Sequence, residues 1–481
     1  MEMERKYMEL DKDLLARQEA RALAAAAKTA QQQLAKMDQR QLDRICSAMA
    51  KAFVASASAL ADMAVRETGF GNVADKIVKN EFASQRVWEA IRNMRTVGIL
   101  KEDPQEKIWE IGVPVGVIAA IVPSTNPTST VCYKALIAIK SGNSIVFSPH
   151  PKALESTVKA VQILLDAAKA AGAPEGVISC LRSGRMEGCK ELMTAPQINL
   201  ILATGGPAMV RSAYSSGKPA IGVGAGNGPA YIHHSADVGH ALDCILRSKA
   251  FDYGTICASE QSIIIEKSLE QTVLTEGKKR GFYFMDETQA ASLAKLLFKP
   301  TGGLNPDIVG KSAIVLAEKA GFCVPGNTKV LVAYEQQAGP TRPYSMEKLC
   351  PVLAFFVMDS TQAVLEKCKE VLSHEGSGHT FSMHATDTEV IRQFALEIPV
   401  SRFLVNTPSA LGGIGATTGL FPALTLGCGA VGGSSSSNNI SPMDLMNIRR
   451  VAWDKAPAQP EDALIERITV KILEKLNQPH I

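Results

Sequence analysis

Val115-Gly-Val-Ile-Ala-Ala-Ile-Val122 is a continuous run of small and β-branched apolar residues. A strand with one face in water alternates apolar and polar residues, whereas this run has no polar face. It is therefore typical of a parallel strand that helices cover on both sides. The wider apolar stretch, 111–122, is broken by Gly and Pro and is too short to cross a bilayer.

Candidate helices and strands alternate along the chain after this run. The helices are predicted at 128–140, 153–171, 187–193 and from Pro207, and the strands at 144–148, 177–181, 200–203 and 220–223. Strands that alternate with helices indicate βαβ units and a doubly wound parallel sheet. Such sheets bind ligands beyond the carboxyl ends of their strands, so a site is expected in the loops that follow them.

A second region of the same kind follows residue 257. Its strands are predicted at 262–265, 330–333, 352–357, 380–384 and 403–406, with helices such as 362–373 and 388–397 between them. A chain of 481 residues is long enough for two or three domains. The sequence therefore predicts an α/β protein with a first domain at 1–250, which begins with covering helices, and a second domain at 251–430.

The composition excludes several classes of protein. The formal net charge is only +3, so no basic surface for nucleic acid is expected. The N-terminus is charged and lacks the apolar core of a signal peptide, which predicts a cytoplasmic protein with no membrane segment. The ten cysteines form no C-x-x-C pair, and no histidine joins them at ligand spacing. Free thiols and no metal site are therefore predicted.

One of these cysteines lies in a turn of small residues, Phe251-Asp-Tyr-Gly-Thr-Ile-Cys-Ala-Ser-Glu-Gln261, between a helical run and an apolar strand. Most cysteines in cytoplasmic proteins are only small buried apolar residues. The chemical alternative is a nucleophile that attacks an aldehyde carbonyl. The turn alone makes Cys257 a candidate nucleophile and no more.

Two further segments lie where a doubly wound sheet binds its ligand. Thr204-Gly205-Gly206 follows a strand and opens a helix, so its backbone N–H groups suit a pyrophosphate, although the G-x-G-x-x-G fingerprint is absent. Such turns are also glycine-rich for steric reasons alone. Asn126 follows the first strand and offers an amide N–H₂ to a developing oxyanion. From local sequence, a turn residue or helix cap before Pro127 is the better interpretation of this asparagine.

Seven motifs occur in one order. They are VPSTNPTST (122–130), FSPHP (147–151), ATGGP (203–207), IGVGAGN (221–227), the cysteine turn, Glu347 before Cys350-Pro351-Val352, and LTLGCG (424–429). This order and spacing resembles the CoA-acylating branch of the aldehyde dehydrogenase superfamily, from about residue 10 to 453. The likeness is to the aldehyde half of bifunctional aldehyde–alcohol dehydrogenases and to aldehyde dehydrogenases of bacterial microcompartments. It implies two Rossmann-type α/β domains plus an oligomerisation segment.

The resemblance also implies roles for individual residues. Cys257 matches the nucleophile, and Asn126 matches the oxyanion-hole asparagine, which acts with the backbone N–H of Cys257. Glu347 matches the glutamate that holds the nicotinamide ribose of NAD. The remaining cofactor-binding residues that it implies are Pro123, Ser124, Thr125, Ser148, His150, Thr204, Gly205, Gly206, Val223, Gly224 and Pro351. Pro149-His150-Pro151 departs from the hydrolytic enzymes, which leaves NAD versus NADP selectivity open.

One position separates two activities. Hydrolytic members of the superfamily carry a glutamate that activates water, and alignment on the glycines places Val223 there. Loss of a general base costs about 10²–10⁴-fold in rate. A thiol is intrinsically nucleophilic and needs less help, so this substitution favours CoA as the acyl acceptor. The implied reaction converts a short-chain aldehyde, propanal or acetaldehyde, into acyl-CoA and NADH. The alternatives are a hydrolytic dehydrogenase that releases a free acid and a non-enzymatic scaffold.

The end of the chain has a different character. Residues 431–453 are predicted to return to the first domain as an oligomerisation segment and to form, with a strand near 107–113, the interface of a homodimer or homotetramer. Residues 454–481 contain a Pro/Ala linker and an amphipathic helix at 461–476, with Leu464, Ile468, Ile472 and Leu476 four residues apart. The helix resembles an encapsulation peptide that binds a microcompartment shell protein. Packing on its own chain or on another subunit is the alternative.

Overall fold

The computed structural model describes residues 11–299, 303–455 and 460–476. The apolar run at 115–122 forms β3 (Val117–Ile121), and all five of its residues are buried. Strand β3 is the centre of a five-stranded parallel sheet with the order β5-β4-β3-β6-β7. The other strands are β4 (Ser144–Ser148), β5 (Ile178–Cys180), β6 (Leu200–Thr204) and β7 (Ala220–Val223). The predicted doubly wound sheet is confirmed.

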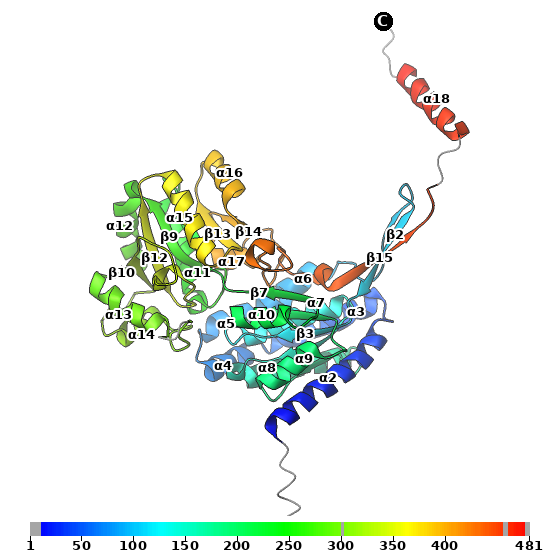
Figure 1. Ribbon diagram of the computed structural model, residues 1–481, viewed down its shortest axis with the longest axis horizontal. Helices are drawn as coiled ribbons and strands as arrows, with labels where there is room; N and C mark the ends of the chain where they lie inside the picture. Colours follow the sequence, from blue (N-terminus) through cyan, green and yellow to red (C-terminus); the bar gives the residue numbers. More distant parts are fainter. Residues whose placement is uncertain (1–10, 300–302, 456–459, 477–481) are drawn as a thin grey trace, which may run out of the picture.

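Helices cover both faces of this first sheet (Figure 1). Ile118 and Ala120 pack into a core with α3 (Gln39–Ala55), α7 (Pro127–Lys140) and α8 (Leu154–Ala170). The alternate β3 residues pack on the other side against α2 (Lys12–Leu34), α9 (Met186–Thr194) and α10 (Pro207–Tyr214). The lack of a polar face in β3 follows from this double cover. Local signals also act: Asp38 and Gln41 form a capping box at the start of α3.

Three shorter helices complete this domain between α3 and β3. They are α4 (Ala57–Thr68), α5 (Val73–Glu81) and α6 (Val87–Ile91). Helix α5 begins at Asn72, whose side chain accepts a hydrogen bond from the Asp75 N–H. Its position decides the chemistry of the site, because it brings two lysines against the loop that follows β3.

The second sheet is parallel and has seven strands, in the order β10-β11-β12-β9-β8-β13-β14. These are β8 (Gly228–Ile232), β9 (Glu260–Glu266), β10 (Phe282–Phe284), β11 (Val330–Tyr334), β12 (Val352–Met358), β13 (Gly378–His384) and β14 (Val400–Val405). Its helices are α11 (Val238–Ala250), α12 (Glu270–Arg280), α13 (Glu287–Leu297), α14 (Ala313–Lys319), α15 (Thr361–His374), α16 (Thr388–Glu397) and α17 (Ser409–Gly413). The alternating pattern predicted this region as a second α/β unit.

Two of the boundaries that differ from the predicted ones concern the second sheet. Strand β8 and helix α11 lie before residue 251, yet β8 belongs to the second sheet, because Ala230–Ile232 pair with Ile263–Ile265 and with β13. Helix α11 packs against that sheet. The two sheets therefore divide between Val223 and Gly228. Strand β14 begins at Val400 and not at Phe403, because Val400 already pairs with Gly378.

A small antiparallel sheet extends from the body of the molecule (Figure 1). It contains β1 (Gly98–Asp103), β2 (Ile108–Pro114) and β15 (Met446–Ala452), with β2 in the centre. Next to each other on this sheet, the partly exposed rings of Trp109 and Trp453 pack edge to face, with 4.9 Å between their centroids. This is the segment predicted to form a homodimer or homotetramer; the assembly stays a prediction, which sedimentation equilibrium would check.

Helix α18 (Pro460–Leu476) follows β15 and stands away from the body (Figure 1). The residues predicted as its apolar stripe are about half exposed or more. Within the described ranges, no single helix is long and apolar enough to span a bilayer; one bent pair, α3 with α4, passes by length and composition.

Candidate active site

A cavity of about 260 Å³ lies between the two sheets. Its walls are the loops after β3, β4, β6 and β7 and the segments that precede β9 and β12. The carboxyl edge of the first sheet thus faces the amino ends of two strands of the second. The lining includes the predicted residues Cys257, Asn126, Pro123, Ser124, Thr125, His150, Thr204, Gly205, Gly206, Val223, Gly224 and Glu347.

Two predicted residues are not in this lining. Ser148 ends β4, where its buried hydroxyl lies beside the Cys189 thiol and its carbonyl accepts a hydrogen bond from the Val122 N–H at 3.1 Å. Pro351 opens β12, and its carbonyl accepts from the Leu331 N–H at 2.9 Å. Both residues support the walls of the cavity and do not face it.

The cysteine turn is shaped by its backbone. After α11, Asp252 and Tyr253 adopt left-handed φ angles of 47° and 52°. Gly226 then packs against the turn, and a Cβ atom at this glycine would lie 2.0 Å from the carbonyl oxygen of Cys257. The Gly226 N–H donates to Glu347 Oε1 at 3.0 Å. A residue with a side chain at position 226 would therefore displace Cys257, which is why the loop after β7 requires glycine here.

The electrostatics of the site favour neutral groups. Burial, followed in size by the nearby Glu347 and Cys428, raises the pKa of the Cys257 thiol to about 12. Burial also raises the pKa of Glu347 to about 8, with Glu375 adding to the shift. At neutral pH both groups are therefore mainly protonated in the protein without ligands.

A buried histidine that the sequence did not single out lies beside this loop. A Cβ atom at Gly226 would be 3.2 Å from the His379 ring. The Nδ1 atom of His379 lies 2.8 Å from the Thr380 hydroxyl, and its Nε2 atom has no partner among the described residues. Burial lowers the pKa of His379 well below its ordinary value, followed in size by the effect of Arg402. The imidazole is therefore neutral.

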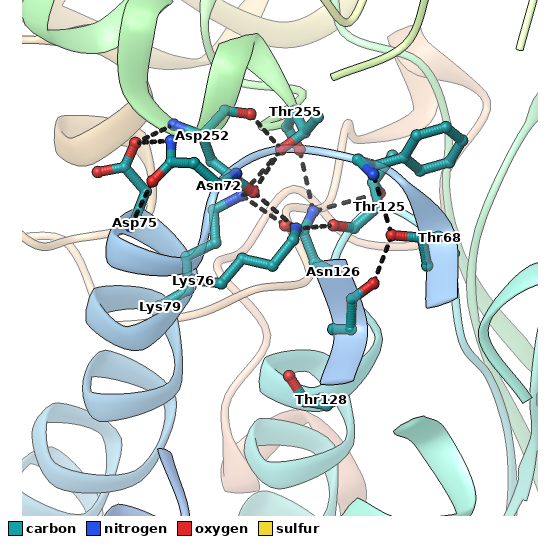
Figure 2. A network of polar contacts seen from close by, with 12 residues as sticks. Thr68, Asn72, Asp75, Lys76, Lys79, Thr125, Asn126, Thr128, Asp252 and Thr255 are labelled. Atoms are coloured by element: carbon teal, nitrogen blue, oxygen red, sulfur yellow. Dashed lines mark hydrogen bonds and ion pairs between the residues drawn. The ribbon is translucent and has the colours of Figure 1, made fainter. Parts of the chain in front are cut away.

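Asn126 is held in a network of polar contacts (Figure 2). Its Oδ1 atom accepts a hydrogen bond from Lys79 Nζ at 2.6 Å, and its Nδ2 atom donates to the Thr255 carbonyl at 3.0 Å. Lys79 Nζ also lies 2.5 Å from Asp252 Oδ2 and 3.0 Å from the Thr255 hydroxyl. The network therefore joins α5, the loop after β3 and the cysteine turn.

A second lysine completes this network. Lys76 Nζ lies 2.9 Å from Asp252 Oδ2 and donates to the Thr125 carbonyl at 2.9 Å. Both lysine side chains are 3 % exposed and the Asp252 side chain is fully buried. No motif in the sequence indicates this arrangement. The available signal was two lysines three apart, which places them on one face of a helix but does not reveal a buried partner 173 residues away.

The turn after β6 fits a dinucleotide. Gly206 is open on its Cβ side, and Gly205 and Thr204 line the cavity beside it. The buried Thr204 hydroxyl has no partner among the described residues, so it is free to bind a ligand. Helix α10 begins directly after this turn at Pro207, which has no N–H, and the Met209 N–H already donates to the Gly206 carbonyl at 3.0 Å. The pyrophosphate site at Thr204, Gly205 and Gly206 stays a prediction.

One group of side chains elsewhere has the composition of a metal site. Among the residues with a described position, ligand atoms of His233, His234 and Glu266 lie within 4.8 Å of one another. His234 Nδ1 and Glu266 Oε2 already form an ion pair at 3.3 Å. The group lies at the carboxyl ends of β8 and β9, whereas Cys257 precedes β9. It therefore takes no part in the chemistry at the cavity.

Comparison with known proteins agrees with this geometry. Residues 12–281 match the model of the aldehyde dehydrogenase family. The bifunctional aldehyde-alcohol dehydrogenase AdhE of Escherichia coli K12 is 43% identical over 451 residues, which cover 91% of this chain and 50% of that protein. The chain thus spans about half the length of this curated relative.

Two solved structures align with this chain over nearly their whole length. An acetylating aldehyde dehydrogenase from Geobacillus thermoglucosidasius is 47% identical, with a TM-score of 0.91, and the match covers 93% of this chain and 99% of that one. A propionaldehyde dehydrogenase of Rhodopseudomonas palustris, solved with CoA and an acylated cysteine, is 27% identical, with a TM-score of 0.83 and coverage of 90% and 97%. The resemblance found in the motifs is confirmed. The chain therefore belongs to the aldehyde dehydrogenase family.

Proposed function

We propose that the protein is an NAD-dependent, CoA-acylating aldehyde dehydrogenase that converts a short-chain aldehyde, propanal or acetaldehyde, into acyl-CoA. The observation that carries this proposal is the composition of the cavity wall. The wall holds Val223 where a hydrolytic enzyme needs a carboxylate, while Cys257 and Asn126 line the same cavity. The acylated cysteine and bound CoA of the Rhodopseudomonas palustris relative support it.

The chemistry has two halves. The Cys257 thiolate adds to the aldehyde carbonyl, and the oxyanion accepts hydrogen bonds from Asn126 Nδ2 and the Cys257 N–H. Thr204, Gly205 and Gly206 would hold NAD⁺, which would supply the hydride acceptor for the oxidation of the carbonyl carbon to a thioester on Cys257. The CoA thiolate then attacks this thioester, releases acyl-CoA and returns Cys257 as a thiolate. The chain itself binds, orients and stabilises the oxyanion in both halves.

One residue keeps a hydrolytic reaction as the second candidate. Glu347 is the acidic side chain in the described lining of the cavity, and its pKa of about 8 suits a general base near neutral pH. Its Oε1 atom, however, accepts the Gly226 N–H. A water molecule activated by Glu347 would release a free acid in place of acyl-CoA.

The need for CoA separates the two reactions. With propanal and NAD⁺, we expect steady NADH formation only when CoA is present, and at most one equivalent of NADH per subunit without it. Acyl-CoA and free acid, quantified by chromatography, identify the acceptor. Continued turnover at an unchanged rate without CoA, with accumulation of propanoate, would show that the enzyme is hydrolytic.

Helix α18 is proposed to bind a microcompartment shell protein. Its stripe presents Ile468 and Ile472, 48% and 53% exposed, to solvent. We expect the double substitution Ile468→Glu and Ile472→Glu to abolish co-sedimentation with assembled shells and to leave CoA-dependent activity unchanged. Glu466→Ala, an exposed position outside the predicted stripe, is the matched control. Full co-sedimentation of the double variant would rule this role out.

A further inference from the structure

Lys79 is buried, and every N–H bond of its ammonium group already has an acceptor. Its three N–H bonds meet three acceptors: Asn126 Oδ1 at 2.6 Å, Asp252 Oδ2 at 2.5 Å and the Thr255 hydroxyl at 3.0 Å. Lys79 also lines the cavity. An ammonium with no spare donor cannot bind the substrate oxygen without breaking one of these contacts. Its action on the reaction must therefore pass through a neighbour.

That neighbour is the oxyanion donor. The oxygen and nitrogen of a carboxamide occupy nearly the same volume, so shape alone does not decide which of them faces the cavity. An ammonium can bind only the oxygen, and it fixes Asn126 with Nδ2 between the Thr255 carbonyl at 3.0 Å and the Thr125 hydroxyl at 3.2 Å, a neutral acceptor that the aldehyde oxygen would replace. A cation on Oδ1 also withdraws charge from the amide, which makes its N–H bonds better donors.

A purely structural ion pair would not need this contact. Lys76, one turn earlier on α5, already binds Asp252 and the Thr125 carbonyl, and so ties the helix to both loops. Lys79 binds the same carboxylate and additionally reaches Asn126 (Figure 2). A second buried cation beside the first adds charge repulsion and a desolvation cost. A purely structural role for Lys79 does not explain why the protein carries that cost.

We infer that Lys79 is a positioning residue for catalysis, which holds the Asn126 carboxamide so that its N–H₂ group meets the oxygen of the bound aldehyde. The inference rests on the proposed oxyanion role of Asn126. It concerns the aldehyde-oxidising half of the reaction, which precedes the choice of CoA or water.

The charge of Lys79 is sensitive to pH. Burial lowers its pKa to about 8, and the adjacent Lys76 contributes in the same direction, while Asp252 and Asp75 oppose the shift. Burial disfavours ionisation of Asp252, but Lys79 and Lys76 outweigh it and lower the pKa of that carboxyl, which stays charged. As the pH rises through 8, the ammonium therefore loses its proton and its hold on Asn126 weakens.

The test is a double-mutant cycle on the first turnover. The rate constant of the NADH burst with propanal, without CoA, is measured for wild type, Lys79→Met, Asn126→Ala and the double variant. Removal of one oxyanion donor costs about 10²–10³-fold. We expect the burst rate constant to fall by that factor in Asn126→Ala and by about 10–100-fold in Lys79→Met. The double variant should be no slower than Asn126→Ala. Equal effects of Lys79→Met in both backgrounds would overturn the inference.

Two variants control for the loss of a buried lysine. Lys140→Met removes a fully buried lysine that pairs with Asp43, neither of which lines the cavity, and the folded protein should keep the wild-type burst. Lys79→Arg keeps the charge and should recover part of the rate. Wild-type bursts in Lys79→Met would contradict the role of Lys79.

The pH profile gives the same answer when Lys79→Met does not fold. Ionisation of Cys257 affects wild type and Asn126→Ala alike, so the ratio of their burst rate constants isolates the asparagine. We expect this ratio to fall above pH 8, and a constant ratio from pH 6 to 10 would overturn the inference. Because the burst precedes the acceptor step, a hydrolytic wild type would refute the proposed function and leave this coupling intact.

Discussion

Cys257→Ala is expected to remove all CoA-dependent NADH formation. The thiol supplies the bond that carries the acyl group between the two half-reactions, and no other described cysteine lines the cavity. In other enzymes that use covalent catalysis, loss of the nucleophile costs roughly 10⁴-fold or more in kcat. Steady-state NADH absorbance and mass spectrometry of the acyl-enzyme measure the two consequences of the change.

The control for this prediction is a thiol elsewhere. Cys323 is an exposed free cysteine, and Cys323→Ala should retain wild-type kinetics. Alkylation by iodoacetamide gives a second measurement: because burial raises the pKa of Cys257 to about 12, its alkylation rate should increase through pH 10 in the free enzyme. Near-wild-type turnover of Cys257→Ala would assign the nucleophile to another residue.

Asp252→Ala is expected to lower the free energy of unfolding more than any other substitution proposed above. It leaves Lys76 and Lys79, each 3 % exposed, without the carboxylate that both of them contact. Removal of one partner from a buried ion pair costs about 3–5 kcal/mol of the free energy of unfolding, because the remaining charge is buried and uncompensated. Urea denaturation at pH 7, followed by circular dichroism, measures the change.

An exposed ion pair provides the comparison. Asp62 and Arg66 are 50% and 74% exposed, so Asp62→Ala should cost at most about 0.5 kcal/mol. The pH dependence has a definite sign. The pKa of Asp252 is lowered on folding, so its contribution is complete above its unfolded value near 3.8 and is lost as the pH falls through the folded value. Equal stability of the two variants would show that the network does not stabilise the fold.

The parts of the structure that local sequence specifies were predictable. The strand at 144–148 and the helices near 362–373 and 388–397 follow from apolar spacing, because each pattern is complete within one element. Sheet membership was not, since Gly228–Ile232 follow the first sheet in sequence but pair with residues of the second. Ser148 shows a similar limit: its motif was found, but the direction of its side chain depends on the tertiary structure.

The residues of the site also fall into those that could be predicted from the sequence and those that could not. Cys257 and Asn126 lie in motifs that can be recognised from their order in the sequence, so the resemblance located both residues. Lys79 and Asp252 become partners only when α5 meets the cysteine turn, and His379 lies beside Gly226 only when β13 packs next to that loop; each of them looks ordinary in its own segment. Burial changes a lysine from a solvated surface residue into a positioning charge, and burial is a property of the whole fold.

The small antiparallel sheet has a consequence for folding order. Val113 of β2 pairs with Asn447 of β15, so both parallel sheets are synthesised between the two strands. Until β15 leaves the ribosome, one edge of β2 has unpaired N–H and C=O groups. Contacts this distant in sequence carry a large loop-closure cost and form late. Nascent chains therefore expose this edge for most of their synthesis, which makes it a natural site for chaperone binding or aggregation.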